Sequence, residues 1–227
     1  MSSIAHNLEE VRSTIAAACR KVGRDPKDVR LVAVSKTVDS ERVRQALAAG
    51  QDIFGENYLQ EARDKIAALG PQVSWHLVGH LQTKKAKAAV ELFDLIHAVD
   101  RLKLARALDA AAATLDKIQD ILIQINQAGE DTKSGVAPEA AADLLKEVVQ
   151  LPHLRVRGLM TMPPWFPDPE EARPYFKALR ELRDRLQDQS GLPLVELSMG
   201  MSGDFAVAAE EGATLVRVGT AIFGHRR

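Results

Sequence analysis

Apolar positions along the chain recur with two different spacings. Near the N-terminus they fall three or four residues apart, which predicts a helix over residues 4–22. Beyond it, short and nearly continuous apolar runs alternate with stretches of helical spacing. We predict a strand at each of these runs, at residues 29–34, 52–57, 73–80, 95–100, 120–126, 156–162, 194–200 and 214–219.

These runs also predict the kind of sheet. Continuous rather than alternating apolarity indicates strands that are buried on both faces, as parallel strands are. Regular alternation of strands and helices predicts an α/β fold, and eight units are the number that closes a (β/α)8 TIM barrel. The competing doubly wound sheet would need a glycine-rich turn after the first strand, but residues 33–37 contain no glycine and no G-x-G-x-x-G occurs.

We therefore predict a single barrel domain over residues 1–227. Only residues 221–227 follow the last strand segment and its exit, too few for a closing helix. The N-terminal helix precedes the first strand and is expected to complete the outer ring of helices. Long linkers, repeats and low-complexity segments are not expected.

Composition narrows the class of protein. The 227 residues are 46% hydrophobic, and 30 basic against 31 acidic residues give a net charge of -1. Such balance offers no electrostatic footprint for nucleic acid or an anionic membrane. No apolar run is long enough to cross a bilayer, and the N-terminus does not read as a secretory signal, so we expect a cytoplasmic protein. The single cysteine, Cys19, excludes an internal disulfide and is expected to be a buried, inert thiol.

Lys36 is the first candidate for chemistry. It follows the apolar run Leu31 to Val34, so it would lie at the carboxyl end of the first strand, where barrel active sites form. Desolvation there would disfavour the charged ammonium, and a neutral amine can attack an aldehyde to form a Schiff base. The alternative is an ordinary lysine that extends its head into solvent.

A second candidate is the glycine-rich segment 197–205, LSMGMSGDF. Its glycines permit close approach of the backbone to a ligand, and Ser202 offers a hydroxyl ahead of a helix that starts with free N–H groups. The exit of the last strand adds Gly219 and Thr220. Phosphate sites in barrels are commonly built from these two loops, although glycine–serine turns also occur purely as turns.

Arg217 is the third candidate, because it lies in the middle of an apolar strand. A buried arginine is costly unless it is paired or faces a polar lumen. It could form an ion pair in the core with Glu196 on the neighbouring strand. Alternatively it could donate a hydrogen bond to a ring nitrogen of a ligand and leave that nitrogen unprotonated.

The remaining polar groups are weaker candidates for a functional site. His76 and His80 would share a face of the third strand, but no third metal ligand is evident, so no metal site is predicted. Residues 129–134, GEDTKS, resemble a phosphate loop without the required glycine and spacing. His97 and His153 are interpreted as scattered structural or surface residues.

Seven strings, taken in order, together resemble one family over nearly the whole chain. They are AVSKT, FGENYLQEA, WHLVGHLQTKK, LIQIN with KSG, RGLMTMP, LSMGMSGDF and VRVGTAIFG. Each string is weakly specific, but the ordered set resembles the YggS/PROSC family of pyridoxal phosphate homeostasis proteins, whose barrel is similar to that of bacterial alanine racemases. Gly203, after Ser202, departs from relatives that have an acidic residue there.

The resemblance implies that the cofactor is pyridoxal 5'-phosphate (PLP). It implies that Lys36 carries PLP as an internal aldimine and that Arg217 faces the pyridine nitrogen. Further positions follow from the resemblance alone: Ser202, Gly219 and Thr220 for the phosphate, and Asn57 and His80 lining the site.

Two functions remain open at this point. One is a carrier that binds PLP and serves its intracellular homeostasis by buffering or delivery, with PLP-dependent apoenzymes as recipients. The other is an amino-acid racemase or related PLP enzyme. Racemisation needs bases on both faces of the substrate carbanion. In the racemases that the barrel resembles, the second base is a tyrosine from an additional domain across a dimer.

The carrier is favoured by three features. The only tyrosines are Tyr58 and Tyr175, and neither matches that second base. An arginine at the ring nitrogen leaves that nitrogen unprotonated, which makes the ring a weaker electron sink. A mouth without a lid domain leaves the cofactor exposed to water, which weakens electrostatic catalysis. The chain ends at the barrel, so a dimerising domain is not expected, and we predict a monomer without robust catalysis.

Overall fold

The computed structural model describes residues 3–70, 72–129 and 134–224, which form a closed parallel barrel. Each strand pairs with the next along the chain, and β8 pairs with β1, so the predicted (β/α)8 TIM barrel is confirmed. The strands are β1 (Arg30–Val34), β2 (Ile53–Glu56), β3 (Ser74–Leu77), β4 (Leu95–Val99), β5 (Gln119–Ile125), β6 (Leu154–Thr161), β7 (Glu196–Ser198) and β8 (Leu215–Val218).

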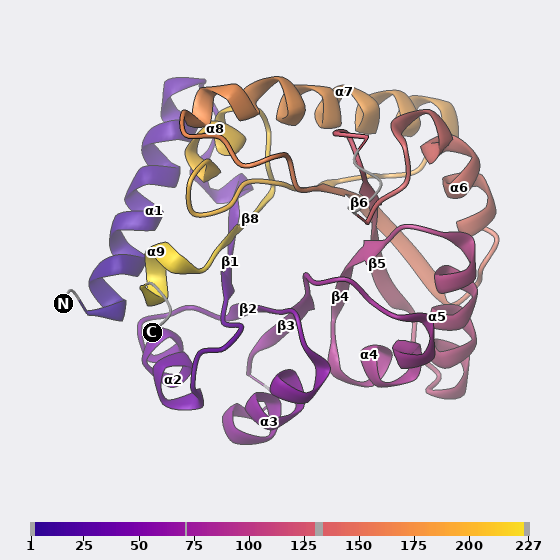
Figure 1. The fold of residues 1–227 in the computed structure, drawn as a ribbon, viewed down its shortest axis with the longest axis horizontal. Coiled ribbons are helices and arrows are strands. Elements are labelled where there is room, and N and C mark those ends of the chain that lie inside the picture. The colour runs from indigo at the N-terminus through magenta and orange to yellow at the C-terminus, as the bar shows by residue number, and fades with distance from the viewer. Residues whose placement is uncertain (1–2, 71, 130–133, 225–227) are drawn as a thin grey trace.

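Helices surround the strands on the outside of the barrel (Figure 1). They are α1 (Ile4–Lys21), α2 (Ser40–Ala48), α3 (Leu59–Leu69), α4 (Ala86–Leu92), α5 (Leu102–Thr114), α6 (Ala141–Val148), α7 (Arg173–Ser190), α8 (Phe205–Glu210) and α9 (Thr220–Phe223). Short 3-10 turns also occur, at Pro26–Asp28, Thr83–Lys85, Pro138–Ala140 and Pro169–Ala172. The turn at Pro138 leads directly into α6.

Helix α1 completes the outer ring, as predicted. It packs against α8, α9 and α2, which places it between the last and first units of the barrel (Figure 1). The Asn7 side chain donates a hydrogen bond of 2.8 Å to the carbonyl oxygen of Ile222 in α9. Cys19 lies on the buried face of α1, and burial raises the pKa of its thiol. A raised thiol pKa fits the expected inert cysteine.

The apolar residues divide into two layers. A small cluster fills the barrel interior and includes Val32, Leu122 and Leu215. A much larger cluster lies between the strands and the helices. The strands are thus buried on both faces, which is why their apolar runs are nearly continuous. Among the described residues, no helix is long and apolar enough to cross a membrane.

Candidate functional site

Lys36 lies in a tight turn directly after β1. The Val38 N–H donates a hydrogen bond of 3.0 Å to the Ser35 carbonyl, which closes a four-residue turn with Lys36 and Thr37 at its centre. Thr37 has a φ of 62°, the sign that a type II turn requires at its third residue. Such a φ is unusual for a β-branched side chain, so the turn is strained. Lys36 itself is half-buried at the carboxyl-terminal mouth of the barrel.

A buried ion pair supports this turn from beneath. The Lys65 ammonium lies 2.6 Å from the Glu56 carboxylate and 2.6 Å from the Ser35 carbonyl oxygen. The Ser35 hydroxyl donates to the same Glu56 oxygen at 2.6 Å. Burial raises the pKa of Glu56, while Lys65 and Ser35 oppose that rise. A second acid, Glu61, accepts a hydrogen bond of 2.7 Å from the Thr37 N–H.

The predicted phosphate loops come together beside this turn. The Ser202 hydroxyl accepts hydrogen bonds of 3.3 Å from the N–H groups of Gly219 and Ala221, at the start of α9. A Cβ atom at Gly219 would lie 3.1 Å from the carbonyl oxygen of Val34, the last residue of β1. A larger residue at Gly219 would force the exits of β8 and β1 apart by a few tenths of an ångström, so glycine favours their close packing. A hydroxyl and backbone N–H groups can bind a phosphate here without a full positive charge.

Arg217 points into the barrel interior two residues before Gly219. Its guanidinium donates to the Ser198 hydroxyl at 2.6 Å and to the Thr161 carbonyl oxygen at 2.9 Å. Burial lowers the pKa of Arg217 to about 10, so it stays charged at neutral pH. Among the described residues no carboxylate forms an ion pair with it. A buried cation with neutral partners is suited to donate to a ligand.

The alternative ion pair between Arg217 and Glu196 does not form. The Glu196 carboxylate lies 2.5 Å from Arg30 and accepts a hydrogen bond of 2.7 Å from the Thr214 hydroxyl. Both partners belong to the amino-terminal end of the barrel. The two charged residues lie on adjacent strands but have different partners. Glu196 interacts at the amino-terminal end of the barrel, whereas Arg217 interacts with Ser198 and Thr161 in the barrel interior.

A chain of hydrogen-bonded polar side chains extends from Arg217 through the barrel interior. Ser198 contacts His97 Nδ1 at 2.8 Å, and His97 Nε2 lies 3.1 Å from His76 Nδ1. Burial lowers the pKa of His76 to about 3 and that of His97 well below its ordinary value. Both rings are therefore neutral. The expectation that His97 is a scattered surface or structural residue missed this connection, whereas His153 does lie in a half-exposed pair with Asp109.

Asn57 and His80 lie at the exits of β2 and β3. A Cβ at Gly79 would lie 2.8 Å from the Cα of Asn57, so glycine is needed for the two exits to touch. His80 is exposed, and its Nδ1 lies 2.8 Å from the Ser134 hydroxyl. His76 is buried within β3, so the expectation that His76 and His80 share a strand face is wrong: His80 lies beyond the end of β3.

The predicted site residues therefore occupy one arc of the mouth. Going around the barrel, this arc runs from the β7 and β8 exits, with Ser202, Gly219 and Thr220, to Lys36 after β1 and on to Asn57 and His80. No group of three or more metal-ligating side chains occurs in residues 3–70, 72–129 and 134–224. Most of the loop-like segment 129–134 lies outside the described residues.

Sequence reasoning missed Lys65. The periodicity of α3 assigns Leu59, Ala62, Ile66 and Leu69 to the inner face, but the buried residues of α3 are Ala62, Lys65 and Leu69. The signal was available in the i, i+4 spacing of Glu61 and Lys65, whose charged atoms lie 3.6 Å apart. Its partner Glu56 is a charged residue at the end of an apolar strand.

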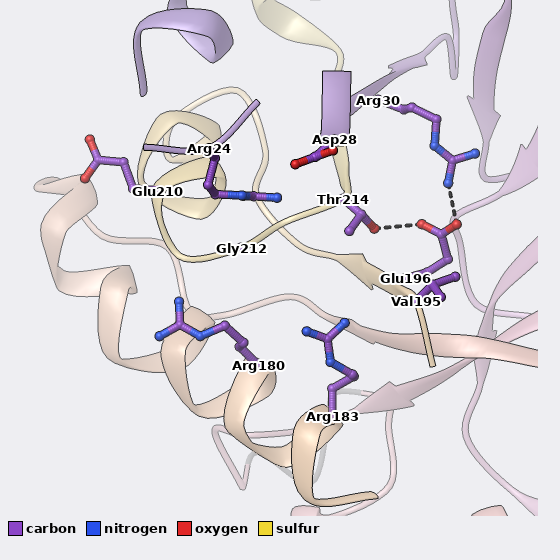
Figure 2. A pocket seen from close by; sticks show the side chains of 10 residues that line it. All are labelled: Arg24, Asp28, Arg30, Arg180, Arg183, Val195, Glu196, Glu210, Gly212 and Thr214. Atoms are coloured by element: carbon purple, nitrogen blue, oxygen red, sulfur yellow. Dashed lines mark hydrogen bonds and ion pairs between the residues drawn. The ribbon is translucent and has the colours of Figure 1, made fainter. Parts of the chain in front are cut away.

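A cavity of about 640 Å³ lies at the opposite end of the barrel (Figure 2). It is lined by the starts of β1, β7 and β8 and by arginines of α7, and Figure 2 shows Glu196 between Arg30 and Thr214. Conserved chemistry in barrels sits at the carboxyl ends of the strands, and the amino-terminal face serves stability. The mouth that carries Lys36 is therefore the candidate functional site.

Comparisons with known proteins agree with this fold. The family described as "Alanine racemase, N-terminal domain" matches residues 1–227. Solved alanine racemase from Clostridium difficile superimposes with a TM-score of 0.76 at 16% identity, over 99% of this chain and 57% of that one. That likeness concerns the fold alone. The chain thus belongs to the class of barrels described as the alanine racemase N-terminal domain.

Relatives of similar length identify the family more narrowly. The pyridoxal phosphate homeostasis protein of Aquifex aeolicus is 45% identical over 97% of both chains, and that of Pseudomonas aeruginosa is 46% identical over 100% of this chain and 97% of its own. PipY of Synechococcus elongatus, solved with PLP bound, is 40% identical with a TM-score of 0.87, over 98% of this chain and 100% of its own. This chain belongs to the family of pyridoxal phosphate homeostasis proteins.

Proposed function

We propose that this protein binds PLP as a Schiff base on Lys36 and serves intracellular PLP homeostasis without robust catalysis. The contact between Gly219 and Val34 carries the proposal, because it sets the Ser202 loop beside the Lys36 turn. In PLP the aldehyde and the phosphate-bearing carbon are neighbouring substituents of the ring. A site for PLP therefore needs an amine and a phosphate cradle side by side.

The other residues fit the same orientation. Arg217 lies on the strand that leads to Gly219 and points deeper into the barrel, where the nitrogen side of a bound ring would lie. Since a guanidinium only donates hydrogen bonds, the ring nitrogen would stay unprotonated. Thr220 begins α9 and would lie next to the phosphate, and Asn57 and His80 would line the far side.

The bond to Lys36 forms by condensation. The neutral amine attacks the aldehyde carbon, a C=N bond replaces C=O, and one water molecule leaves. PLP supplies the electrophilic aldehyde, and the chain supplies the amine, the phosphate cradle and a cationic donor. The reaction reverses on hydrolysis, which suits a protein that takes up and releases its cofactor.

Titration with PLP tests the proposal. The wild-type protein and a Lys84→Ala control, altered at an exposed lysine, should develop the visible band of an imine. Lys36→Ala should not. A Lys36→Ala variant with an unchanged band would overturn the assignment.

The carrier role and the racemase alternative differ in turnover. Of the two tyrosines, Tyr58 is 57% exposed at the start of α3, and Tyr175 packs its ring 5.7 Å from Phe166. We infer that neither serves as a second base, and that PLP passes from a monomer to PLP-dependent apoenzymes. Incubating the loaded protein with alanine or serine enantiomers should yield no racemisation, and adding an apoenzyme should restore that enzyme's activity. Racemisation at the rate of a dedicated enzyme would contradict the carrier role.

A further inference from the structure

The turn that presents Lys36 is held at the residues on either side of Lys36 by groups from two other elements. Before Lys36, the Ser35 carbonyl and hydroxyl bind Lys65 and Glu56, each at 2.6 Å. After Lys36, the Thr37 N–H donates to Glu61 at 2.7 Å. Lys65 and Glu61 both belong to α3, and Glu56 ends β2.

The support is stronger than the turn itself requires. The Ser35 carbonyl already accepts the hydrogen bond from Val38 that closes the turn. Lys65 adds a charged donor to that oxygen, although the Lys65 side chain is only 6% exposed and the Glu56 side chain is fully buried. Burying such a pair is costly and rarely stabilises a fold on balance. A costly pair at this place indicates a role in conformation.

The φ of Thr37 supports the same conclusion. Residues held in the left-handed region without glycine persist only where their surroundings impose the conformation, and they concentrate at functional sites. Here the surroundings include the hydrogen bond from the Thr37 N–H to Glu61 and the hydrogen bond from the Val38 N–H to Ser35 that closes the turn. The strained residue is the immediate neighbour of Lys36.

We propose that Glu56, Glu61 and Lys65 are positioning residues for Lys36. They hold the turn after β1 in the conformation that directs the Lys36 amine toward the neighbouring Ser202 loop. This inference rests on the proposed condensation of PLP with Lys36. It assigns to α3 a role in cofactor binding without contact to the cofactor.

Glu61 offers the cleanest test, because its side chain is 34% exposed and can be changed without opening the core. Glu61→Gln removes the charge but keeps an oxygen that accepts from the Thr37 N–H. Glu61→Ala removes both. Loss of a nearby negative charge favours the neutral amine and would speed condensation, whereas loss of positioning would slow it. The two effects have opposite signs and can be told apart.

The experiment measures the rate of imine formation at several pH values, the PLP dissociation constant and the melting temperature of the cofactor-free protein. We expect Glu61→Ala to slow condensation and weaken PLP binding by about 3- to 10-fold, the effect of one lost hydrogen bond. Glu61→Gln should equal or exceed the wild-type rate. Glu41→Ala, which alters an exposed acid of α2, is the matched control and should match wild type.

The outcomes separate this inference from the proposed function. If the wild type forms the imine on Lys36 and Glu61→Ala forms it at the same rate with the same pH profile, the positioning role is wrong. If the wild type forms no imine on Lys36, the proposed function itself fails. A slowed Glu61→Ala with an unchanged melting temperature supports positioning, whereas slowing that merely tracks a fall in melting temperature overturns it.

Discussion

The Lys65 ammonium lies 2.6 Å from the carbonyl oxygen of Ser35, the residue before Lys36. The same ammonium forms a buried ion pair with Glu56. A structural charge thus reaches from the outer ring of helices to the backbone of the proposed cofactor tether. Under the proposed positioning role, the stability of the barrel and the presentation of Lys36 are linked.

Lys65→Met should lower the free energy of unfolding by about 3–5 kcal/mol, because it leaves the Glu56 carboxylate buried without its cation. Lys177→Met, which removes an exposed pair with Glu181, is the control and should cost less than about 0.5 kcal/mol. Denaturant unfolding measures both. Combining Lys65→Met with Glu56→Leu should recover most of the loss, and a double variant as unstable as the single one would contradict this account.

Ser202→Ala should weaken PLP binding about tenfold, because it removes the hydroxyl that lies at the Gly219 and Ala221 N–H groups. The loss should be specific to the phosphate. Binding of pyridoxal, which has the aldehyde but no phosphate, should therefore stay within about twofold of wild type. Ser13→Ala, at an exposed serine of α1, is the control. Equal losses for PLP and pyridoxal would place the phosphate elsewhere.

The buried histidines predict a pH dependence of stability. The pKa of His76 is lowered to about 3 in the folded protein, against 6.5 for an ordinary histidine. Between these values the unfolded chain binds a proton that the folded chain does not, so stability falls as pH falls. His76 alone should contribute about 1.4 kcal/mol of lost stability per pH unit over this range.

Urea unfolding of wild type and His76→Asn between pH 7 and pH 4 measures that slope. The variant should show a shallower dependence, and the difference between the two curves removes the contributions of other groups. Parallel curves would show that His76 is protonated in the folded state, against its burial beside His97.

Thr37→Gly should raise the free energy of unfolding by about 1 kcal/mol, because glycine adopts a φ of 62° without strain. Asp116→Gly is a matched comparison, since Asp116 has a φ of 48° at an exposed turn. Its gain should be smaller because aspartate tolerates this region better than a β-branched residue does. Thermal melting of the two variants provides the measurement, and a lower stability for Thr37→Gly would show that the threonine side chain stabilises the turn.

Much of the fold could be predicted from the sequence, for a physical reason. Strands buried on both faces leave nearly continuous apolar runs, and their alternation with helices leaves few topologies. Closure of the barrel then makes β8 the neighbour of β1. For this reason Lys36 and Gly219 could be expected to lie close together, although 182 residues lie between them in the sequence.

The supporting network could not be predicted in the same way. A lysine at the boundary of a helix face reads as solvent-exposed, and the neighbouring Ile66 fits the apolar stripe better than Lys65 does. The link between His97 and Ser198 crosses the barrel interior between β4 and β7, a contact that no local spacing encodes. The burial of Lys65 and the contact between His97 and Ser198 both depend on tertiary contacts between elements that are distant in the sequence.

The condensation of PLP with Lys36 is tested most directly by trapping it. The protein is incubated with PLP, reduced with borohydride and digested, and the mass of each lysine-containing peptide is determined. Reduction converts the imine to a stable secondary amine and so records which lysine held the cofactor. The account predicts the added mass on the peptide that contains Lys36; added mass on a different lysine, or on none, would contradict it.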